Sequence, residues 1–232
     1  MFTNKLLADS FKRAVANTLW LLLGVPAGMA AGLAVAHLLN DKTLKGRQFF
    51  RVLMYLPAVS GAVALNIIWR YIFNSEFGVV GFLFGHDKYW LSDKVLLKLA
   101  IIVKGIWGGM GGTMLLYLAG MQNISSTYYE AADIDGASRA KKFFAITLPM
   151  LTPVTFYLLV MGLIGGLQSY TESQVFADGV KEGQTIVFFI WQRGISNARY
   201  GIASAASILL AAVIMIVTVI QFRLSNKWVY ED

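Results

Sequence analysis

Cysteine is absent from this sequence of 232 residues, which excludes disulfide bonds, thiol catalysis and cysteine-ligated metal sites. Histidine is nearly absent as well, because His37 and His86 are the only two and lie in separate segments, so a histidine metal site is not expected. The sequence also lacks the phosphate-binding loop G-x-x-x-x-G-K-[ST], and no nucleophile–base set or pair of catalytic carboxylates can be assembled from it. We therefore expect a chain that is not an enzyme and that binds no metal or cofactor of its own.

Charged residues are also scarce, at 14% of the chain, whereas hydrophobic residues make up 57% and the mean hydropathy is +0.60. A soluble domain contains roughly 45–50% apolar residues, so water is not the main solvent of this chain. The net charge of +7 could indicate a nucleic-acid partner, but no long basic run accompanies it. Basic residues of membrane proteins mark loops and headgroup contacts instead. The composition therefore predicts a membrane protein with no nucleic-acid partner.

A helix that crosses a bilayer needs about 20 mostly apolar residues, and its backbone groups must be paired within the helix. The segments that meet this requirement are residues 15–39, 52–73, 97–119, 147–168 and 202–222. A further apolar run, 185–191, is too short to span and ends in Trp191, which is typical of an interfacial or re-entrant helix. The sequence thus predicts an all-α polytopic membrane bundle of about five spans, forming a single domain over residues 1–232.

The positions of proline and glycine predict where the spans kink and where they pack closely. Pro26 and Pro57 fall inside spans and are expected to kink them, whereas Pro149 and Pro153 fall near the first turn of the fourth span, where a missing N–H costs least. Crowded glycines in the third span predict tight helix packing, with a flexible gating helix as the alternative: Gly105, Gly108, Gly109, Gly111 and Gly112. The loop 40–51 is short and rich in Lys and Arg, which favours its placement on the cytoplasmic side.

The loop between the third and fourth spans, residues 120–147, is polar yet helix-prone. Thr127 is followed three residues later by Glu130, which fits a capping box and a helix start near Thr127. Gly136 is expected to end this helix in a left-handed conformation, and Ser138 can cap a second helix that runs to Pro149. We call residues 127–149 the elbow.

The surface of the elbow carries small residues, Ala131 and Ala132, which would leave a low profile for a partner. A plain connector between two spans is the alternative interpretation. A connector needs neither two capped helices nor a surface of small side chains, so we interpret the elbow as a docking element in the aqueous phase.

The elbow also resembles a known signature. The pattern Glu130-Ala131-Ala132-x-x-Asp135-Gly136-Ala137, followed by Phe143, Ile146, Leu148-Pro149 and Pro153, resembles the "EAA" signature in the permease subunits of type I ABC importers. Three further stretches are similar to the carbohydrate-type (maltose- and glycerol-phosphate-like) branch of that family: Asn17-Thr18, Gly201-x-Ala203-Ser204-Ala205 and Lys227-Trp228-Val229-Tyr230. Members usually have one more span before the Asn17-Thr18 helix, giving a core of six, and a proline where Ser125 stands here.

The resemblance implies a function for the elbow and a set of partners. A separate ATPase would couple to Glu130, Ala131, Ala132, Asp135, Gly136, Ala137, Ile146, Leu148 and Pro149. The partners would be a second permease subunit (homologous or identical), two ATP-binding subunits that hold ATP and Mg, and an extracytoplasmic solute-binding protein. The complex would lie in the cell (inner or plasma) membrane of a prokaryote and import a carbohydrate or a related solute.

Candidates for lining the substrate pathway are polar or aromatic residues in or near the outer halves of spans: Asn66, Lys104, Trp107, Gln168, Tyr170 and Glu172. For Lys104 the alternative is extension to the membrane surface, and for the others it is ordinary interhelical hydrogen bonding and an aromatic belt. Two other functions remain open. One is a permease for amino acids, phosphate or peptides, and the other is an ATP-independent secondary transporter, which typically shows intramembrane carboxylates or inverted repeats.

Overall fold

The structure, a computed structural model, describes residues 5–41, 43–85, 89–177 and 180–230, so His86 lies outside the described residues. In these ranges every regular element is a helix, which confirms the predicted all-α class. The α-helices are α1 Lys5–Leu21, α2 Gly24–Asn40, α3 Arg47–Val59, α4 Ala62–Ile72, α5 Val79–Phe84, α6 Leu96–Gln122, α7 Ser126–Ile134, α8 Arg139–Lys142, α9 Leu148–Met150, α10 Thr152–Leu167, α11 Ile186–Trp191 and α12 Tyr200–Ser225. The other helical turns are η1 Phe143–Thr147, η2 Glu172–Phe176 and η4 Gln192–Ser196, which are π-helical, and η3 Lys181–Gly183, which is a 3₁₀ turn.

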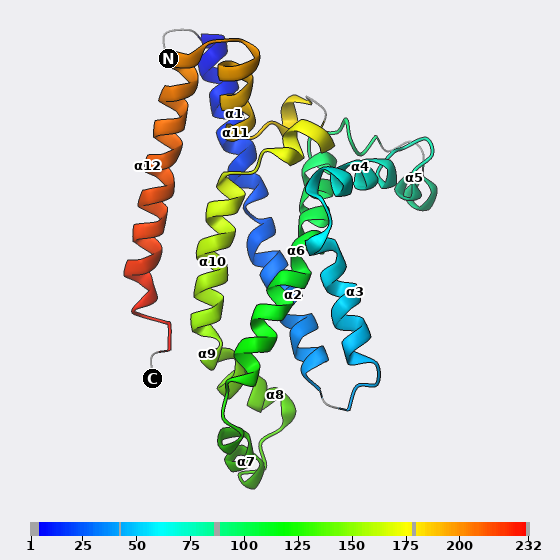
Figure 1. The fold of residues 1–232 in the computed structure, drawn as a ribbon, viewed down its shortest axis with the longest axis vertical. Helices are drawn as coiled ribbons and strands as arrows, with labels where there is room; N and C mark the ends of the chain where they lie inside the picture. Colours follow the sequence, from blue (N-terminus) through cyan, green and yellow to red (C-terminus); the bar gives the residue numbers. More distant parts are fainter. Residues whose placement is uncertain (1–4, 42, 86–88, 178–179, 231–232) are drawn as a thin grey trace.

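Among the described residues, 3 helices are long and apolar enough to cross a membrane alone: Leu6–Asn40, Leu96–Gln122 and Tyr200–Ser225. The predicted second and fourth spans are each a bent pair of helices, so the count reaches 5 only if each pair is taken as one span. Figure 1 shows the long helices side by side, with the elbow at the bottom and the starts of α1 and α12 at the top. The loop after α2, the elbow and the end of α12 lie toward the same end of the bundle.

The second predicted span, 52–73, is wrong as a continuous helix. It bends by 100° between α3 and α4, because Ser60 and Gly61 both adopt extended backbone conformations. Pro57 lies inside α3, whose last turn closes with a hydrogen bond from the Ser60 N–H to the Pro57 carbonyl at 3.2 Å. At the place of the kink expected from Pro57, the helix ends at Val59, two residues after the proline, and the chain bends at Ser60–Gly61.

Pro26 has a milder effect. It removes the N–H that would bond the Leu22 carbonyl, and that carbonyl instead accepts a 3.0 Å hydrogen bond from Val25. The result is a local break at Leu22–Leu23 between α1 and α2, while the two helices continue as one apolar segment.

The fourth predicted span bends by 60° between Arg139–Met150 and Thr152–Leu167. Leu151 stands at this bend with φ −88° and ψ 0°, and Pro153 occupies the first turn of α10, as predicted. The bend separates the elbow from the membrane-crossing part of the chain.

Glycine packing confirms the prediction for the third span only in part. Of the crowded glycines in α6, Gly111 packs tightly, because an added Cβ would lie 2.7 Å from the Tyr55 Cα of α3. The other members of the group have no atom within 4 Å of such a Cβ: Gly105, Gly108, Gly109 and Gly112. Helix α2 approaches α6 closely at its own Gly32, where an added Cβ would lie 2.6 Å from the Thr113 side chain. Most glycines of this group therefore border open space and do not make close helix–helix contacts.

The short apolar run 185–191 forms α11, which buries Ile186, Phe188 and Phe189. Phe189 packs in one hydrophobic cluster with Leu7 and Ala14 of α1 and Ala206 of α12. Three apolar side chains of α11 are therefore covered by protein, whereas Val187, Ile190 and Trp191 are half-buried.

Candidate functional site

The elbow starts one residue earlier than predicted, at Ser126, and its cap is Ser125. The Ser125 hydroxyl accepts a 3.4 Å hydrogen bond from the Thr127 N–H. The predicted capping box of Thr127 and Glu130 is therefore wrong. Because Ser125 takes the extended conformation that a cap requires, Glu130 falls in the second turn of α7.

The end of α7 matches the prediction. Gly136 has φ +69°, a conformation that favours glycine. The Ala137 N–H bonds the Ala132 carbonyl at 2.9 Å and the Gly136 N–H bonds the Asp133 carbonyl at 3.1 Å. This pair of bonds is the Schellman termination, which satisfies the last carbonyls of the helix.

The second arm of the elbow begins at Ser138, whose hydroxyl accepts from the Lys141 N–H at 3.3 Å, as predicted. Helix α8 continues through the π-helical turn η1 into α9. The Leu148 N–H bonds the Phe143 carbonyl, which is one residue further back than in an α-helix. Pro149 directly follows this widened turn.

Two polar contacts connect the arms of the elbow. Lys142 pairs with Asp133 at 2.6 Å, and the Tyr129 and Thr147 hydroxyls share a 2.9 Å hydrogen bond. Thr147 is buried, whereas the Asp133 side chain is 63% exposed. The elbow therefore behaves as one braced unit whose inner side is anchored.

The outer face of the elbow is open to solvent, and α7 has no buried residue. Of the predicted coupling residues, the exposed ones are Glu130, Ala131, Asp135 and Gly136, and the half-buried ones are Ala132, Ala137, Ile146, Leu148 and Pro149. The structure adds Tyr128 and Ile134 to the exposed face, with Ile134 88% exposed. Ile134 was not among the coupling residues predicted from the sequence, although an isoleucine in an otherwise polar helix indicates a contact site.

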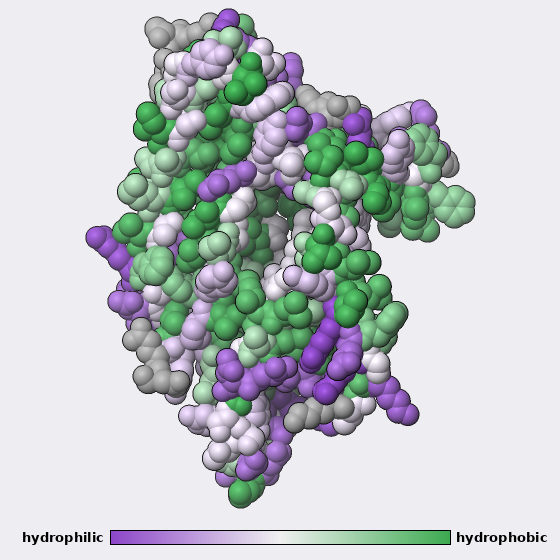
Figure 2. Space-filling model, viewed as in Figure 1, coloured by the Kyte–Doolittle hydropathy of each residue, from purple (hydrophilic) through white to green (hydrophobic). Residues whose placement is uncertain are grey.

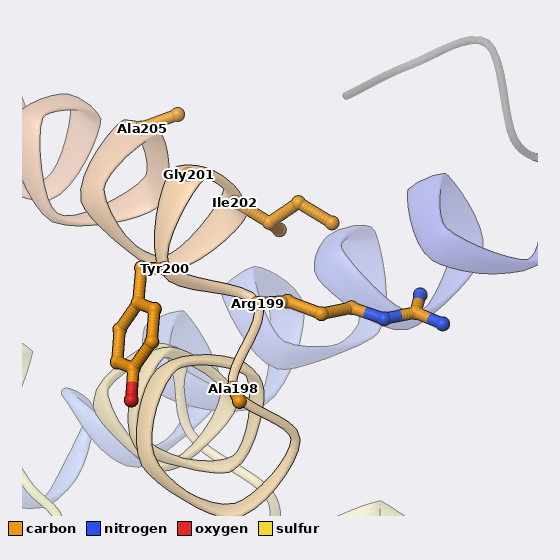
Figure 3. A pocket seen from close by; sticks show the side chains of 6 residues that line it. All are labelled: Ala198, Arg199, Tyr200, Gly201, Ile202 and Ala205. Atoms are coloured by element: carbon orange, nitrogen blue, oxygen red, sulfur yellow. The ribbon is translucent and has the colours of Figure 1, made fainter.

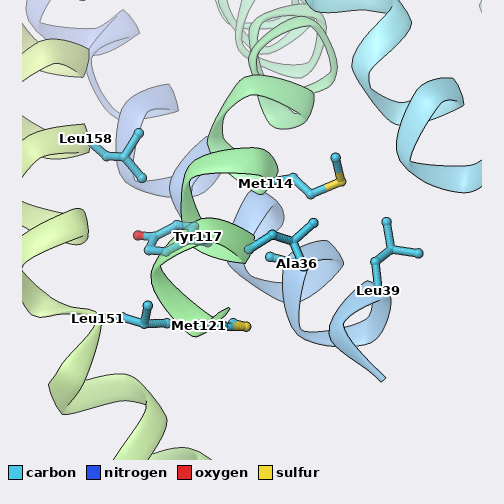
Figure 4. Close-up of a cluster of buried hydrophobic side chains, with 8 residues drawn as sticks. Ala36, Leu39, Met114, Tyr117, Met121, Leu151 and Leu158 are labelled. Carbon is cyan, nitrogen blue, oxygen red and sulfur yellow. The ribbon is translucent and has the colours of Figure 1, made fainter. Parts of the chain in front are cut away.

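Behind the elbow lies a hydrophobic cluster that connects α2, α6 and α10 (Figure 4). Leu151, at the bend, is fully buried in this cluster beside Tyr117 and Met121 of α6. The Tyr117 hydroxyl donates to the Thr155 hydroxyl at 3.3 Å. A movement of the elbow would therefore be transmitted to three long helices.

A cavity of about 490 Å³ opens between α2, α6 and α10, and Figure 2 shows the bundle hollowed at mid-height. Much of its wall is glycine: Gly24, Gly28, Gly105, Gly109, Gly162, Gly165 and Gly166. Its polar lining is Ser169 and Glu172 at one end of α10 and Thr113 on α6. An added Cβ would meet nothing within 4 Å at Gly105, Gly109 and Gly165, whereas at Gly162 and Gly166 it would lie 2.6 Å from the Val25 and Leu22 side chains, so these two glycines allow close helix packing.

Glu172 lines this cavity and forms an ion pair with Lys104, in which the Lys104 side chain is buried and the Glu172 side chain is 23% exposed. One carboxylate oxygen accepts from Lys104 Nζ at 2.9 Å, and the other accepts from the Ser169 hydroxyl at 2.8 Å. Burial raises the pKa of Glu172, but the Lys104 ammonium and these hydrogen bonds outweigh it and hold the pKa below its usual value. Lys104 is only 6% exposed, so it pairs inside the bundle and does not extend to the membrane surface.

Around this pair lies a set of buried and partly buried hydrogen bonds, which we call the outer network: Asn17, Thr18, Lys104, Ser169, Glu172, Ser173 and Thr185. Ser173 donates to the Gly183 carbonyl at 2.6 Å and accepts from the Thr185 N–H at 2.9 Å. Thr18 accepts from the Ile186 N–H at 3.0 Å. The outer network thus ties α1, α6, η2 and α11 together at the end of the bundle opposite the elbow (Figure 1).

Comparison with known proteins decides the family. Residues 24–230 match the family described as "Binding-protein-dependent transport system inner membrane component". The chain belongs to this family. It is 35% identical over 225 residues to a probable ABC transporter permease, YesP, of Bacillus subtilis, covering 92% of this chain and 71% of that protein. It is also 35% identical over 222 residues to the arabinooligosaccharides transport system permease protein AraP of Bacillus subtilis, covering 91% and 68%.

A solved structure agrees with this assignment. A chain in the crystal structure of a bacterial alginate ABC transporter, in complex with an alginate pentasaccharide-bound periplasmic protein, superposes with a TM-score of 0.87. The sequence identity is 28%, and the match covers 97% of this chain and 80% of that one. The protein is therefore a membrane-embedded permease of a binding-protein-dependent transport system.

The six pathway candidates of the permease are not brought together. Only Glu172 lines the cavity, with Lys104 directly behind it. Asn66 is fully buried in α4 and donates to the Ala62 carbonyl at 2.9 Å, while its Oδ1 has no hydrogen-bond partner among the described residues. Gln168 is exposed beyond the end of α10.

The two aromatic candidates lie in separate ring clusters. Trp107 is 40% exposed and contacts Trp69 edge-on at 5.5 Å between centroids. Tyr170 packs with Phe188 at 6.3 Å and Trp191 at 5.8 Å. Neither cluster contributes to the cavity wall.

A second hollow, of about 590 Å³, lies where α12 begins (Figure 3). Its lining comes from residues 198–205, and the side chains of Arg199 and Tyr200 point away from each other. It therefore lacks the converging polar groups of a ligand site. The nearby Ala203 has a packing role, because an added Cβ at Gly194 would lie 2.9 Å from its side chain.

Proposed function

We propose that this permease forms one half of the translocation pathway of an ATP-driven importer for a carbohydrate or a related solute. The observation that supports it most is the elbow, a braced and capped unit whose outer face is exposed while its inner side is joined to the core. Similar proteins, one named for the transport of arabinooligosaccharides and one for that of alginate, support the solute class.

The elbow would be the docking site of a separate ATPase. Glu130 would supply the charged contact, Ala131 and Ile134 would supply a small and an apolar contact, and Gly136 would set the bend. Closure of the ATPase would push α7, and the Tyr129–Thr147 contact would pass the movement to the arm that continues into α10. The permease itself would bind no nucleotide, and ATP and Mg would be held by the partner.

The complete importer would contain this permease, a second permease (homologous or identical), two ATP-binding subunits and an extracytoplasmic solute-binding protein. It would lie in the cell (inner or plasma) membrane of a prokaryote. The polar end of the cavity, Ser169 and Glu172, offers hydrogen-bonding groups suited to the hydroxyls of a carbohydrate.

A co-purification experiment tests the proposal. Glu130→Lys and Gly136→Asp should each leave membrane insertion intact but weaken recovery of the ATPase. Glu130→Lys removes an interfacial charge contact, which costs about 2–5 kcal/mol, and Gly136→Asp disturbs the bend by placing a side chain at φ +69°. Glu76→Lys is the matched control, since Glu76 is also exposed but lies on the segment between α4 and α5, away from the elbow. Undiminished ATPase recovery with both elbow variants would refute the docking role.

The solute class needs a separate measurement. The binding protein recovered with the wild-type complex can be screened against neutral saccharides, acidic saccharides, amino acids and phosphate. A saccharide ligand supports the proposal, whereas an amino acid or phosphate ligand contradicts the solute class and leaves the coupling role standing.

A further inference from the structure

A short arm projects sideways from the bundle beyond α3 (Figure 1). It comprises α4, the turn after it and α5, residues 62–84, and we call it the lateral arm. The 100° bend at Ser60–Gly61 turns α4 away from the direction of α3. The lateral arm therefore runs across the spans instead of along them.

The lateral arm is held rigidly. Asn74 Oδ1 accepts hydrogen bonds from the N–H groups of Glu76 at 2.8 Å and Phe77 at 3.1 Å, which fixes the turn between the helices. Gly78 and Gly81 lie so close to the preceding turn that an added Cβ would be 2.6 Å from the Ile72 carbonyl oxygen or 2.9 Å from the Ser75 carbonyl carbon, respectively. The backbone of the turn that positions α5 is therefore fixed relative to α4.

Those side chains are large, apolar and exposed. The exposed fractions are 66% for Phe77, 58% for Val79, 81% for Phe82, 64% for Leu83 and 59% for Phe84. Figure 2 shows the resulting hydrophobic tip at the side of the molecule. Large exposed apolar side chains gathered on one short helix indicate an interaction surface, because leaving them in water is unfavourable.

The depth of the lateral arm indicates its partner. Phe73 and Val80 pack in one cluster with Leu97, Ala100 and Ile101, so the arm is rooted on the first turns of α6. Helix α6 has 27 residues and is about 40 Å long, roughly 10 Å more than the hydrocarbon core of a bilayer. Its first turns therefore lie near the membrane–water boundary. An apolar helix that runs across the spans at this depth lies in the plane of the interface.

We propose that the lateral arm is a lipid anchor that inserts Phe82, Leu83 and Phe84 among the acyl chains just below the headgroups, in the half of the bilayer opposite the elbow. Lipid fits better than a protein partner because the tip projects sideways beyond α3, whereas the cavity that a second permease must close is formed by α2, α6 and α10. The anchor fixes the outer ends of α3 and α6 at the boundary while the elbow moves at the other end. The choice of lipid over protein rests on the proposed second permease, whereas the insertion of the arm is independent of the ATPase and of the solute.

Spin labelling tests this inference, and the absence of cysteine gives a clean background. A nitroxide is attached to Phe82→Cys in the permease complex as it purifies from membranes, reconstituted in vesicles of phosphatidylethanolamine and phosphatidylglycerol. Collision rates with oxygen, which concentrates in lipid, and with a neutral nickel chelate, which stays in water, are then compared. Leu83→Cys repeats the measurement on the same helix.

Two reference sites calibrate the rates: Ile216→Cys, 58% exposed in the middle of α12, for lipid, and Lys45→Cys, in the exposed loop before α3, for water. The lipid anchor predicts that oxygen collisions exceed nickel collisions at Phe82, as at Ile216 and opposite to Lys45. Greater nickel access at Phe82 would show a water-exposed arm, and low access to both reagents would show a protein partner. Either result overturns the proposal.

Discussion

The two polar regions that flank α10 differ in how they are built. In the elbow, the contacts join residues near one another in sequence, 9 apart for Asp133–Lys142 and 18 apart for Tyr129–Thr147. The outer network also contains local contacts, such as Ser173–Thr185 at 12 residues apart, but other contacts in it join residues 68 apart for Lys104–Glu172 and 168 apart for Thr18–Ile186. The elbow is largely exposed, whereas Ser173 and Thr185 of the outer network are fully buried.

This difference indicates that the elbow serves to bind a partner and the outer network serves to stabilise the fold. Exposed polar groups in the elbow are hydrated and contribute little to stability, so they remain available to bind a partner. Buried polar groups in the outer network must satisfy one another, because each unpaired one costs free energy. The same kind of substitution should therefore reduce partner binding at the elbow and stability at the outer network.

The largest expected effect is at the Lys104–Glu172 pair. Lys104→Met leaves the Glu172 carboxylate without its cation in a buried site, and we expect a loss of about 3–5 kcal/mol in the free energy of unfolding. Unfolding of the purified permease in mixed detergent micelles measures it. The double variant Lys104→Met with Glu172→Leu should be less destabilised than Lys104→Met alone, since replacing a whole buried ion pair by apolar groups is often nearly neutral. A double variant as unstable as the sum of both singles would contradict a direct pair.

The next effect concerns buried hydroxyls. Ser173→Ala removes the acceptor of the Thr185 N–H and should cost about 1–3 kcal/mol, because that donor stays buried. Tyr129→Phe is the matched change at the elbow, and it removes only the bond to Thr147, worth about 0.5–1.5 kcal/mol. The same unfolding assay ranks the two variants. A Tyr129→Phe variant that loses more stability than Ser173→Ala would reverse the proposed division.

The two regions were not equally predictable from the sequence. The elbow could be predicted because its caps and its glycine termination are local, and Gly136 and Ser138 behave as expected. Its start was misplaced because Ser125, Ser126 and Thr127 are adjacent and each can cap a helix. The pairing of Lys104 with Glu172 could not be predicted, because nothing in a single sequence indicates which of many distant groups face each other.

The broken second span shows a different limit. Hydropathy continues across Ser60 and Gly61, so composition alone describes 52–73 as one helix. Two consecutive residues in extended conformation decide the turn of the chain, and neither residue type requires that conformation. The position of the lateral arm therefore became visible only in the structure.

A smaller effect is expected at the bend of the elbow. Gly136→Ala forces an alanine to φ +69°, which should cost about 1–2 kcal/mol locally. Gly108→Ala in α6 is the control, because its added Cβ meets nothing within 4 Å and the helical conformation suits alanine. Amide hydrogen exchange should show faster exchange confined to residues 131–138 in Gly136→Ala and no such change in the control. Unchanged exchange in the elbow would show that its termination adapts without strain.

The smallest effect is expected at the Lys142–Asp133 pair. Although the two charged atoms are 2.6 Å apart, the Asp133 side chain is 63% exposed, so solvent screens the attraction. Lys142→Met should therefore change the free energy of unfolding by about 0.2–1 kcal/mol, and the difference from wild type should shrink further as salt is raised. Lys141→Met, at the exposed neighbouring position, controls for the loss of charge alone. If Lys142→Met instead cost as much as Lys104→Met, the elbow would be part of the structural core, and the contrast between the two ends of α10 would fail.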